Sequence, residues 1–530
     1  SALSSASSRG DWRLLFIQRD RVAAVEAYDV NRVARTYFQK PNRTVGLYVP
    51  AKESQRLAVP AAGPIDAVVK DYQGGTALEA GEAFDPSPAN LDARLIVVAE
   101  GGLKSGLLPK KNRGETVSLV ITLHYGNSES LKGQATAAGM LPGVMMAGTK
   151  KHDRQALREE LDALGIRIGT GGGGRRRGGR GGRGGGGGGA AGQLTFSVEA
   201  KRNTLPQALE LLGEILREPE FPADEFETSK RRMTSMLTAG RTEPGALAGN
   251  KVSRALSRYS ADDVRYVPTL EETLDRTQSV TLEDVRRLYE SQVGGAHAEL
   301  GVVGDFDPQT TLRLVEAILA GWESKVPFER IDRKAADDIV GFQEDIVTPD
   351  KSNAEYLAGM TFPLCDDDPD YAALRIGNFI FGGSTLASRL GDRIRQKDGL
   401  SYGATSSFVA PSRDPDASLT VTVSTNPENI EKVTAAVMEE LRRFLKDGPT
   451  DKELSDAKQA FIEAQKVDRA GDGAIAAQIV ANLDVGRTFA YAAEQEKAIL
   501  ALTPVEVAEA FRKYVDPKKL VVIRAGDFKK

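Results

Sequence analysis

The chain of 530 residues has one cysteine, three histidines and no long apolar run. Each of these features excludes some classes of protein or of metal site. A single cysteine, Cys365, excludes an intrachain disulfide and a zinc site built from cysteines, and it leaves the compartment open. No window approaches the ~18 uninterrupted apolar residues that a membrane span needs. The formal net charge of -4 gives no overall attraction to nucleic acid or acidic lipid.

The three histidines are His124, His152 and His297, and no two of them have the spacing of metal ligands on one helix. A catalytic zinc usually takes three protein ligands. We therefore expect each histidine to be a surface or structural residue, and we expect no zinc site in this chain.

One sequence pattern occurs three times, at residues 29–51, 284–307 and 505–527. Each copy predicts a short helix that begins near a Thr/Asp cap, then a turn with proline or glycine, then an apolar strand. Three copies of one unit-ending element predict three units.

The positions of these copies predict the domain organisation. Residues 1–52 are expected to be the C-terminal tail of a preceding α+β domain, because the first copy lies near the start. A Pro/Ala/Gly-rich linker at 53–91 leads to a first complete domain at 92–330. A short linker at 331–339 leads to a second complete domain at 340–530.

Within each complete domain the predicted strands come first and the helices follow, as in ETVSLVITLHYG and later LPQALELLGEILREP. Strands and helices without strict βαβ alternation favour an α+β fold. We therefore predict two tandem α/β-sandwich domains, each a sheet with helices on one face.

Residues 169–192 are a glycine- and arginine-rich insertion that cannot bury apolar surface. The favoured interpretation is a tolerated surface insertion, disordered or weakly ordered. Its five arginines could instead contact phosphates, but no aromatic residues lie between them to stack on bases. Nucleic-acid binding therefore stays as an alternative function.

The stretch from Gly101 to Leu164 resembles the first domain of a half of the pitrilysin/insulinase-type zinc metallopeptidases. In active members a helix carries H-x-x-E-H, two histidines that bind zinc and a glutamate that activates water. Aligning AAGMLPGVMMAGT with that motif puts Gly139 and Gly143 in place of the histidines and Pro142 in place of the glutamate. The region expected to supply a third ligand, 233–237, has no carboxylate.

Residues 382–408, GGSTLASRLGDRIRQKDGLSYGATSSF, resemble the most recognisable stretch of the later domain in this family. The resemblance assigns Arg395 and Tyr402 to a pair that binds the substrate backbone and the tetrahedral intermediate. Their chemistry suits that role, because a tyrosine hydroxyl can donate to an oxyanion and a guanidinium to a peptide carbonyl. The alternative is an ion pair of Arg395 at a helix end and a strand-packed Tyr402.

The resemblance implies four similar α+β domains in two halves that face each other like a clamshell, with zinc on one half and the Arg/Tyr pair on the other. This chain would then be the later, substrate-binding half of a zinc metalloendopeptidase acting on peptides or proteins, without the catalytic motif and with no cofactor of its own. The expected partner is a zinc-bearing half, either an upstream segment or a separate subunit, and the expected location is periplasmic or secreted. A structural scaffold subunit with the same fold is the second hypothesis.

Overall fold

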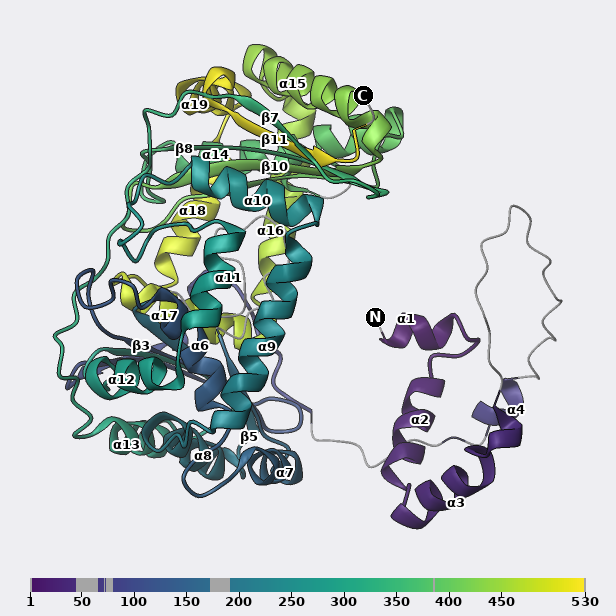
Figure 1. Cartoon of the computed structure of the whole chain (residues 1–530), viewed down its shortest axis with the longest axis vertical. Helices are drawn as coiled ribbons and strands as arrows, with labels where there is room; N and C mark the ends of the chain where they lie inside the picture. The colour runs from purple at the N-terminus through teal and green to yellow at the C-terminus, as the bar shows by residue number, and fades with distance from the viewer. Residues whose placement is uncertain are drawn as a thin grey trace. The chain divides into compact units, whose positions relative to one another are not determined.

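The computed structural model describes residues 2–43, 65–70, 72, 80–171, 191–384 and 387–528. It divides the chain into two units, Ser1–Glu79 and Ala80–Lys530 (Figure 1). Residues 80–91, which the sequence placed in a linker, therefore belong to the second unit. No helix in the described part of the chain is long and apolar enough to cross a bilayer.

The first unit is helical in its described residues. It contains α1 (Ala2–Ser7), α2 (Leu14–Ala23), α3 (Ala27–Tyr37), the 3-10 turn η1 (Lys40–Asn42) and α4 (Asp66–Val69). The Tyr72 hydroxyl donates to the Asp20 carboxylate at 2.6 Å, which joins two parts of the unit. The strand predicted after the first repeat copy, at 45–51, lies outside the described residues.

The second unit begins with α5 (Pro88–Arg94) and a six-stranded sheet, which with its helices we call the first body. The strand order is β1-β2-β6-β3-β5-β4. The strands are β1 (Ile96–Glu100), β2 (Leu103–Pro109), β3 (Thr116–His124), β4 (Arg167–Thr170), β5 (Gln193–Lys201) and β6 (Ala298–Gly304). Its helices are α6 (Ala135–Met145), α7 (Arg154–Leu164), α8 (Leu205–Arg217), α9 (Ala223–Gly240), α11 (Leu270–Ser279), α12 (Leu282–Gln292) and α13 (Pro308–Leu319).

The second body has a five-stranded sheet of order β7-β11-β8-β10-β9. The strands are β7 (Gln343–Val347), β8 (Ala354–Phe362), β9 (Gly403–Val409), β10 (Ala417–Thr425) and β11 (Val521–Gly526). Its helices are α14 (Tyr371–Asn378), α15 (Ile430–Asp447), α16 (Asp451–Asp468), α18 (Ala490–Ala501) and α19 (Pro504–Tyr514). Two π-helical segments, η2 (Phe379–Gly383) and η3 (Gly391–Lys397), and the 3-10 turns η4 (Pro427–Asn429) and η5 (Pro517–Lys519) complete it.

The two sheets share one topology, which confirms the predicted α+β fold. In each sheet one strand runs parallel to the last strand of the body, β2 to β6 and β7 to β11, and the remaining pairs are antiparallel. β5 alternates buried and accessible residues, as expected of a strand with one face on the core. The first body adds β1 at its edge.

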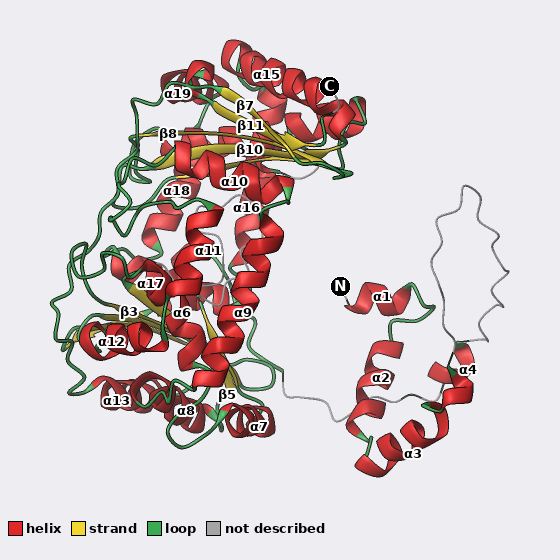
Figure 2. Cartoon of the chain, in the orientation of Figure 1, coloured by secondary structure: helices red, strands yellow, loops and turns green. Residues whose placement is uncertain are grey.

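Each body lends a helix to the other. α10 (Pro244–Ala255) follows the first sheet in sequence but packs on β8 and β11, and α17 (Asp472–Asp484) packs on β2, β3 and β6 (Figure 2). Glycine in the sheet allows this approach, since a Cβ on Gly301 would lie 2.3 Å from the Ala476 carbonyl oxygen of α17. Each sheet therefore has helices on both faces and not on one face as predicted, because the helix from the other body covers the second face. The two bodies form one compact unit.

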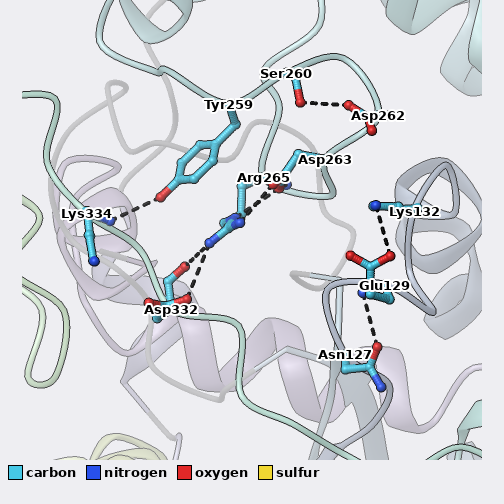
Figure 3. Close-up of polar contacts among 10 residues, drawn as sticks. All are labelled: Asn127, Glu129, Lys132, Tyr259, Ser260, Asp262, Asp263, Arg265, Asp332 and Lys334. Atoms are coloured by element: carbon cyan, nitrogen blue, oxygen red, sulfur yellow. Dashed lines mark hydrogen bonds and ion pairs between the residues drawn. The ribbon is translucent and has the colours of Figure 1, made fainter.

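A polar cluster ties the segment between the bodies to the first body (Figure 3). The Arg265 guanidinium donates to both oxygens of Asp263 at 2.9 and 2.8 Å and to the Asp332 carbonyl at 2.7 Å. Its side chain lies over the Tyr259 ring, whose hydroxyl accepts the Lys334 amide at 3.0 Å. Hydrogen bonds from Arg265 hold the pKa of the Asp263 carboxyl below its usual range.

Candidate functional site

The residues aligned with the zinc motif lie on α6, packed beneath the first sheet. Pro142 is buried inside the helix, where it has no amide to donate to the Ala138 carbonyl. Gly139 and Gly143 lie on an open side of the helix, because a Cβ at either position would meet nothing within 4 Å. α6 keeps its helical form because Met140, Leu141, Val144 and Met145 are buried in the core.

The position expected for a third zinc ligand lies on a helix beside α6 and has no carboxylate. α9 packs against α6 and contains residues 233–237, MTSML. Met233 packs against the first core, and its sulfur accepts a hydrogen bond from the Thr277 hydroxyl at 3.6 Å. This part of the surface therefore has thioether and hydroxyl groups where the motif would need a carboxylate.

Two of the three histidines are neighbours, since the His124 amide donates to the His297 carbonyl at 2.9 Å and both rings pack against Phe328, while His152 lies elsewhere in the first body. His152, in the loop after α6, is hydrogen bonded through Nδ1 to the buried Glu214 and through Nε2 to Glu160, both at 2.9 Å. The His297 ring packs against Phe328 with centroids 5.1 Å apart. Both histidines thus have structural contacts, as expected from the sequence.

His124 belongs to a partly buried donor set that the sequence analysis missed. Its Nε2 lies 2.6 Å from Glu299 on β6, and ligand atoms of His124, Glu299 and Asp484 lie within 4.8 Å of one another. Two cations already neutralise the carboxylates: Lys104 Nζ lies 3.6 Å from Glu299, and Arg413 pairs with Asp484 at 3.6 Å. The set joins elements far apart in sequence, so no local spacing could have revealed it.

Arg395 and Tyr402 lie in the second body, at either end of the turn from η3 to β9. Gly399 has φ +62°, a left-handed conformation that glycine adopts at little cost. The Leu400 amide donates to the Ile394 carbonyl at 2.9 Å, and the Leu400 carbonyl accepts the Thr425 hydroxyl at 2.6 Å. Leu400 therefore ties this turn to η3 through its amide and to β10 through its carbonyl.

The turn holds Tyr402 out in solvent. Its side chain is 96% exposed, next to the edge strand β9. Arg395 is also exposed, on η3. Within the described part of the chain, neither side chain has a hydrogen bond or ion pair. The strand-packed tyrosine and the helix-end ion pair considered from the sequence are therefore not what the structure has.

The neighbouring Arg389, in the same SRL segment, has the opposite environment. Its guanidinium makes two hydrogen bonds to Glu453, at 2.7 and 2.8 Å, and a third to the Gly448 carbonyl at 2.8 Å. In this segment the half-buried Arg389 is thus anchored to α16, and Arg393 pairs with Asp398, while Arg395 is exposed. A rigid support with free donors is the arrangement that substrate positioning requires.

A comparison with protein families finds that residues 279–461 match the model described as "Peptidase M16 inactive domain". Two curated relatives match at 24% identity. The "Probable inactive metalloprotease YmfF" of Bacillus subtilis aligns over 320 residues, 58% of this chain and 70% of that protein. The "Non-peptidase homolog YmxG" of Helicobacter pylori aligns over 279 residues, 51% of this chain and 61% of that protein.

Solved structures show the same fold. A "peptidase M16 inactive domain" from Pseudomonas fluorescens superposes with a TM-score of 0.69 and 22% identity over 82% of this chain and 97% of that chain. The "periplasmic protease PqqL" from Escherichia coli superposes with a TM-score of 0.61 and 15% identity over 95% of this chain. This chain spans about half, 51%, of PqqL.

These matches confirm the resemblance to the pitrilysin/insulinase-type (M16) peptidases expected from the sequence. The chain has the M16 inactive-domain fold, and its named relatives are described as inactive or non-peptidase homologues. In the alignment predicted from the sequence, Gly139, Pro142 and Gly143 of α6 take the positions of the zinc ligands and the catalytic glutamate.

Proposed function

We propose that this inactive M16-type chain is the substrate-binding half of a zinc metalloendopeptidase, and that it completes an active site whose zinc belongs to another half. The observation that carries the proposal is the state of Tyr402. A tyrosine held 96% exposed by a hydrogen-bonded turn, with no partner for its hydroxyl among the described residues, is suited to meet a ligand from outside the chain.

In the assembled site the two side chains would perform different tasks. The Tyr402 hydroxyl would donate a hydrogen bond to the oxyanion that forms when water attacks the peptide carbonyl. The Arg395 guanidinium would donate to a carbonyl of the bound peptide backbone and so fix its position. Zinc on the partner half would supply the polarised carbonyl and the activated water.

The partner is a polypeptide that carries H-x-x-E-H, either an upstream segment or a separate subunit. Location in the periplasm or outside the cell fits this proposal, because PqqL, which shares the fold, is described as periplasmic. The proposal gives this chain no catalytic metal, since Gly139, Pro142 and Gly143 offer neither a ligand nor a proton acceptor.

The test is peptide hydrolysis by this chain combined with the H-x-x-E-H half encoded in the same genome. Tyr402→Phe should lower kcat by about a hundredfold to a thousandfold, the scale for one oxyanion donor. Arg395→Ala should reduce kcat/KM with a larger share in KM, because a guanidinium also holds the ground-state carbonyl. Lys397→Ala is the matched control, an exposed cation on the same segment η3 that pairs with Asp392.

The two effects should be less than additive, because both groups act on one peptide unit. Full activity in the double variant would show that the pair has no part in hydrolysis. That result would favour the scaffold alternative, in which the M16 fold serves assembly only.

A further inference from the structure

α3 in the first unit has the same start as the closing helices of the two bodies, α12 and α19. In all three helices the cap amide donates to the carboxylate of the residue three positions later. The amide of that later residue donates to the Thr hydroxyl in α12 and α19 and to the Glu26 backbone carbonyl in α3. The pairs are Glu26 and Asp29, Thr281 and Asp284, and Thr503 and Glu506. This shared cap fixes the register in which the three helices are compared.

In that register the same positions are apolar in all three helices, but only α3 leaves them exposed. Val30, Val33 and Phe38 of the first unit are 60, 39 and 86% exposed. The corresponding residues are at most 3% exposed; they are Val285, Leu288 and Val293 at α12, and Val507, Ala510 and Val515 at α19. Among the described residues of the first unit, none buries this core-type apolar stripe of α3.

The structure shows what covers this stripe in the two complete bodies. α12 packs on α6, and α19 packs on α14, in each case the helix that follows the central strand. The strand after each closing helix pairs antiparallel with that central strand, β6 with β3 and β11 with β8. Both such positions within Ala80–Lys530 are occupied, so α3 needs a third body of this kind.

The structural comparison supports a counterpart for the first unit. The superposition on PqqL covers 95% of the chain, and Ala80–Lys530 makes up only about 85% of it, so the match includes part of the first unit. That match uses about half of PqqL, which leaves another half beyond it.

We propose that the apolar face of α3 docks onto an α+β body of the zinc-bearing half. There it would take the place that α12 and α19 take in this chain. The face is formed by Val30, Val33, Ala34, Tyr37 and Phe38. The inference rests on the proposed function for the identity of the partner. Burial of three or more large apolar side chains at this face would make α3 a main anchor of the assembly, independent of Arg395 and Tyr402.

Cysteine labelling tests the proposal without relying on activity. Val30→Cys on the apolar face and Asn31→Cys on the polar face are made in a Cys365→Ser background, and the rate of maleimide labelling is measured for each. In the chain alone the two rates should be similar. If position 30 is labelled about tenfold more slowly than position 31 in the chain alone, the face is covered by this chain itself or by a second copy of it. Either result would overturn the proposal, whether or not the protection depends on protein concentration.

The H-x-x-E-H half is then added, and peptide hydrolysis is followed in the same samples. We expect labelling at position 30 to slow by about tenfold or more while position 31 is unchanged. Hydrolysis without protection would overturn the docking of α3 and leave the proposed function standing. Protection without hydrolysis would support the docking and overturn the proposed function. Neither protection nor hydrolysis would overturn both.

Discussion

The ion pair between Arg389 and Glu453 should hold the segment that presents Arg395 and Tyr402. Arg389 lies directly before η3, and Glu453 lies in the first turn of α16. Beyond the two hydrogen bonds between them, the guanidinium lies 5.0 Å from the centre of the Phe444 ring. Only 11% of the arginine side chain and 33% of the glutamate side chain are exposed.

The size of the effect follows from the Glu453 carboxyl. Hydrogen bonds from Arg389 lower its pKa from 4.5 to about 2. That difference corresponds to about 3 kcal/mol. Because a third of the glutamate side chain stays in water, which screens the charges, we expect Glu453→Gln to cost about 1–2 kcal/mol at neutral pH.

The pH dependence has a definite sign. The folded-state pKa of Glu453 is lower than its unfolded value, so the stabilisation is fully present above about 4.5 and is lost as the pH falls from there toward 2. The difference in stabilising free energy between wild type and Glu453→Gln should therefore be constant from pH 7 to 5 and should decrease below pH 5.

Hydrogen exchange of amides in α16 and η3 measures the local free energy of opening. Glu463→Gln on the same helix is the control, since Glu463 forms a surface pair with Lys466 and should matter little. Equal protection in wild type and Glu453→Gln at pH 7, or a difference that does not decrease between pH 5 and 3, would refute the reasoning.

Three further predictions concern the rest of the second unit. The double variant Gly139→His/Gly143→His should fold, since both positions are open. It should gain zinc binding in a titration, because two imidazoles one turn apart form a metal-binding pair. A variant that gains no zinc binding would argue against the alignment of α6 with the zinc motif. Gly301→Ala should destabilise the unit by about 1–3 kcal/mol in thermal unfolding, because its Cβ would overlap the backbone of α17. The helical Gly249→Ala, with nothing within 4 Å of its Cβ, is the control and should be neutral or stabilising by about 0.5–1 kcal/mol. Deleting residues 171–190 should leave the melting temperature nearly unchanged, because a shorter loop between paired strands has a lower closure entropy; loss of a salt-sensitive RNA binding on deletion would instead support the nucleic-acid alternative.

Local patterns were enough to predict the elements that end each unit. The pattern of a short helix that begins near a Thr/Asp cap, followed by a turn and an apolar strand, predicted the helices α3, α12 and α19. These features depend on contacts between residues close in sequence, which is why they can be read from the chain.

Other features gave no clear local signal. β4 is four residues long and was not predicted. Its last two residues, Gly169 and Thr170, lie inside the range 169–192 that was expected to be disordered or weakly ordered, and they pair with β5. The insertion itself lies largely outside the described residues. The partly buried set of His124, Glu299 and Asp484 and the anchoring of Arg389 by Glu453 join distant elements, so neither could be found by spacing.

The sequence by itself predicted the α+β type and the repeated unit, because composition and local periodicity carry that information. The alignment of Gly139, Pro142 and Gly143 with the zinc motif rests on the family resemblance and stays a prediction. Only the tertiary structure decided that α10 covers the second sheet and α17 the first. Both helices have apolar faces that can pack on a sheet, and the sequence of such a face does not predict which sheet the helix will cover. That choice depends on glycines such as Gly301 and Gly359, distant in sequence from the helices they admit, which let a helix approach one sheet closely.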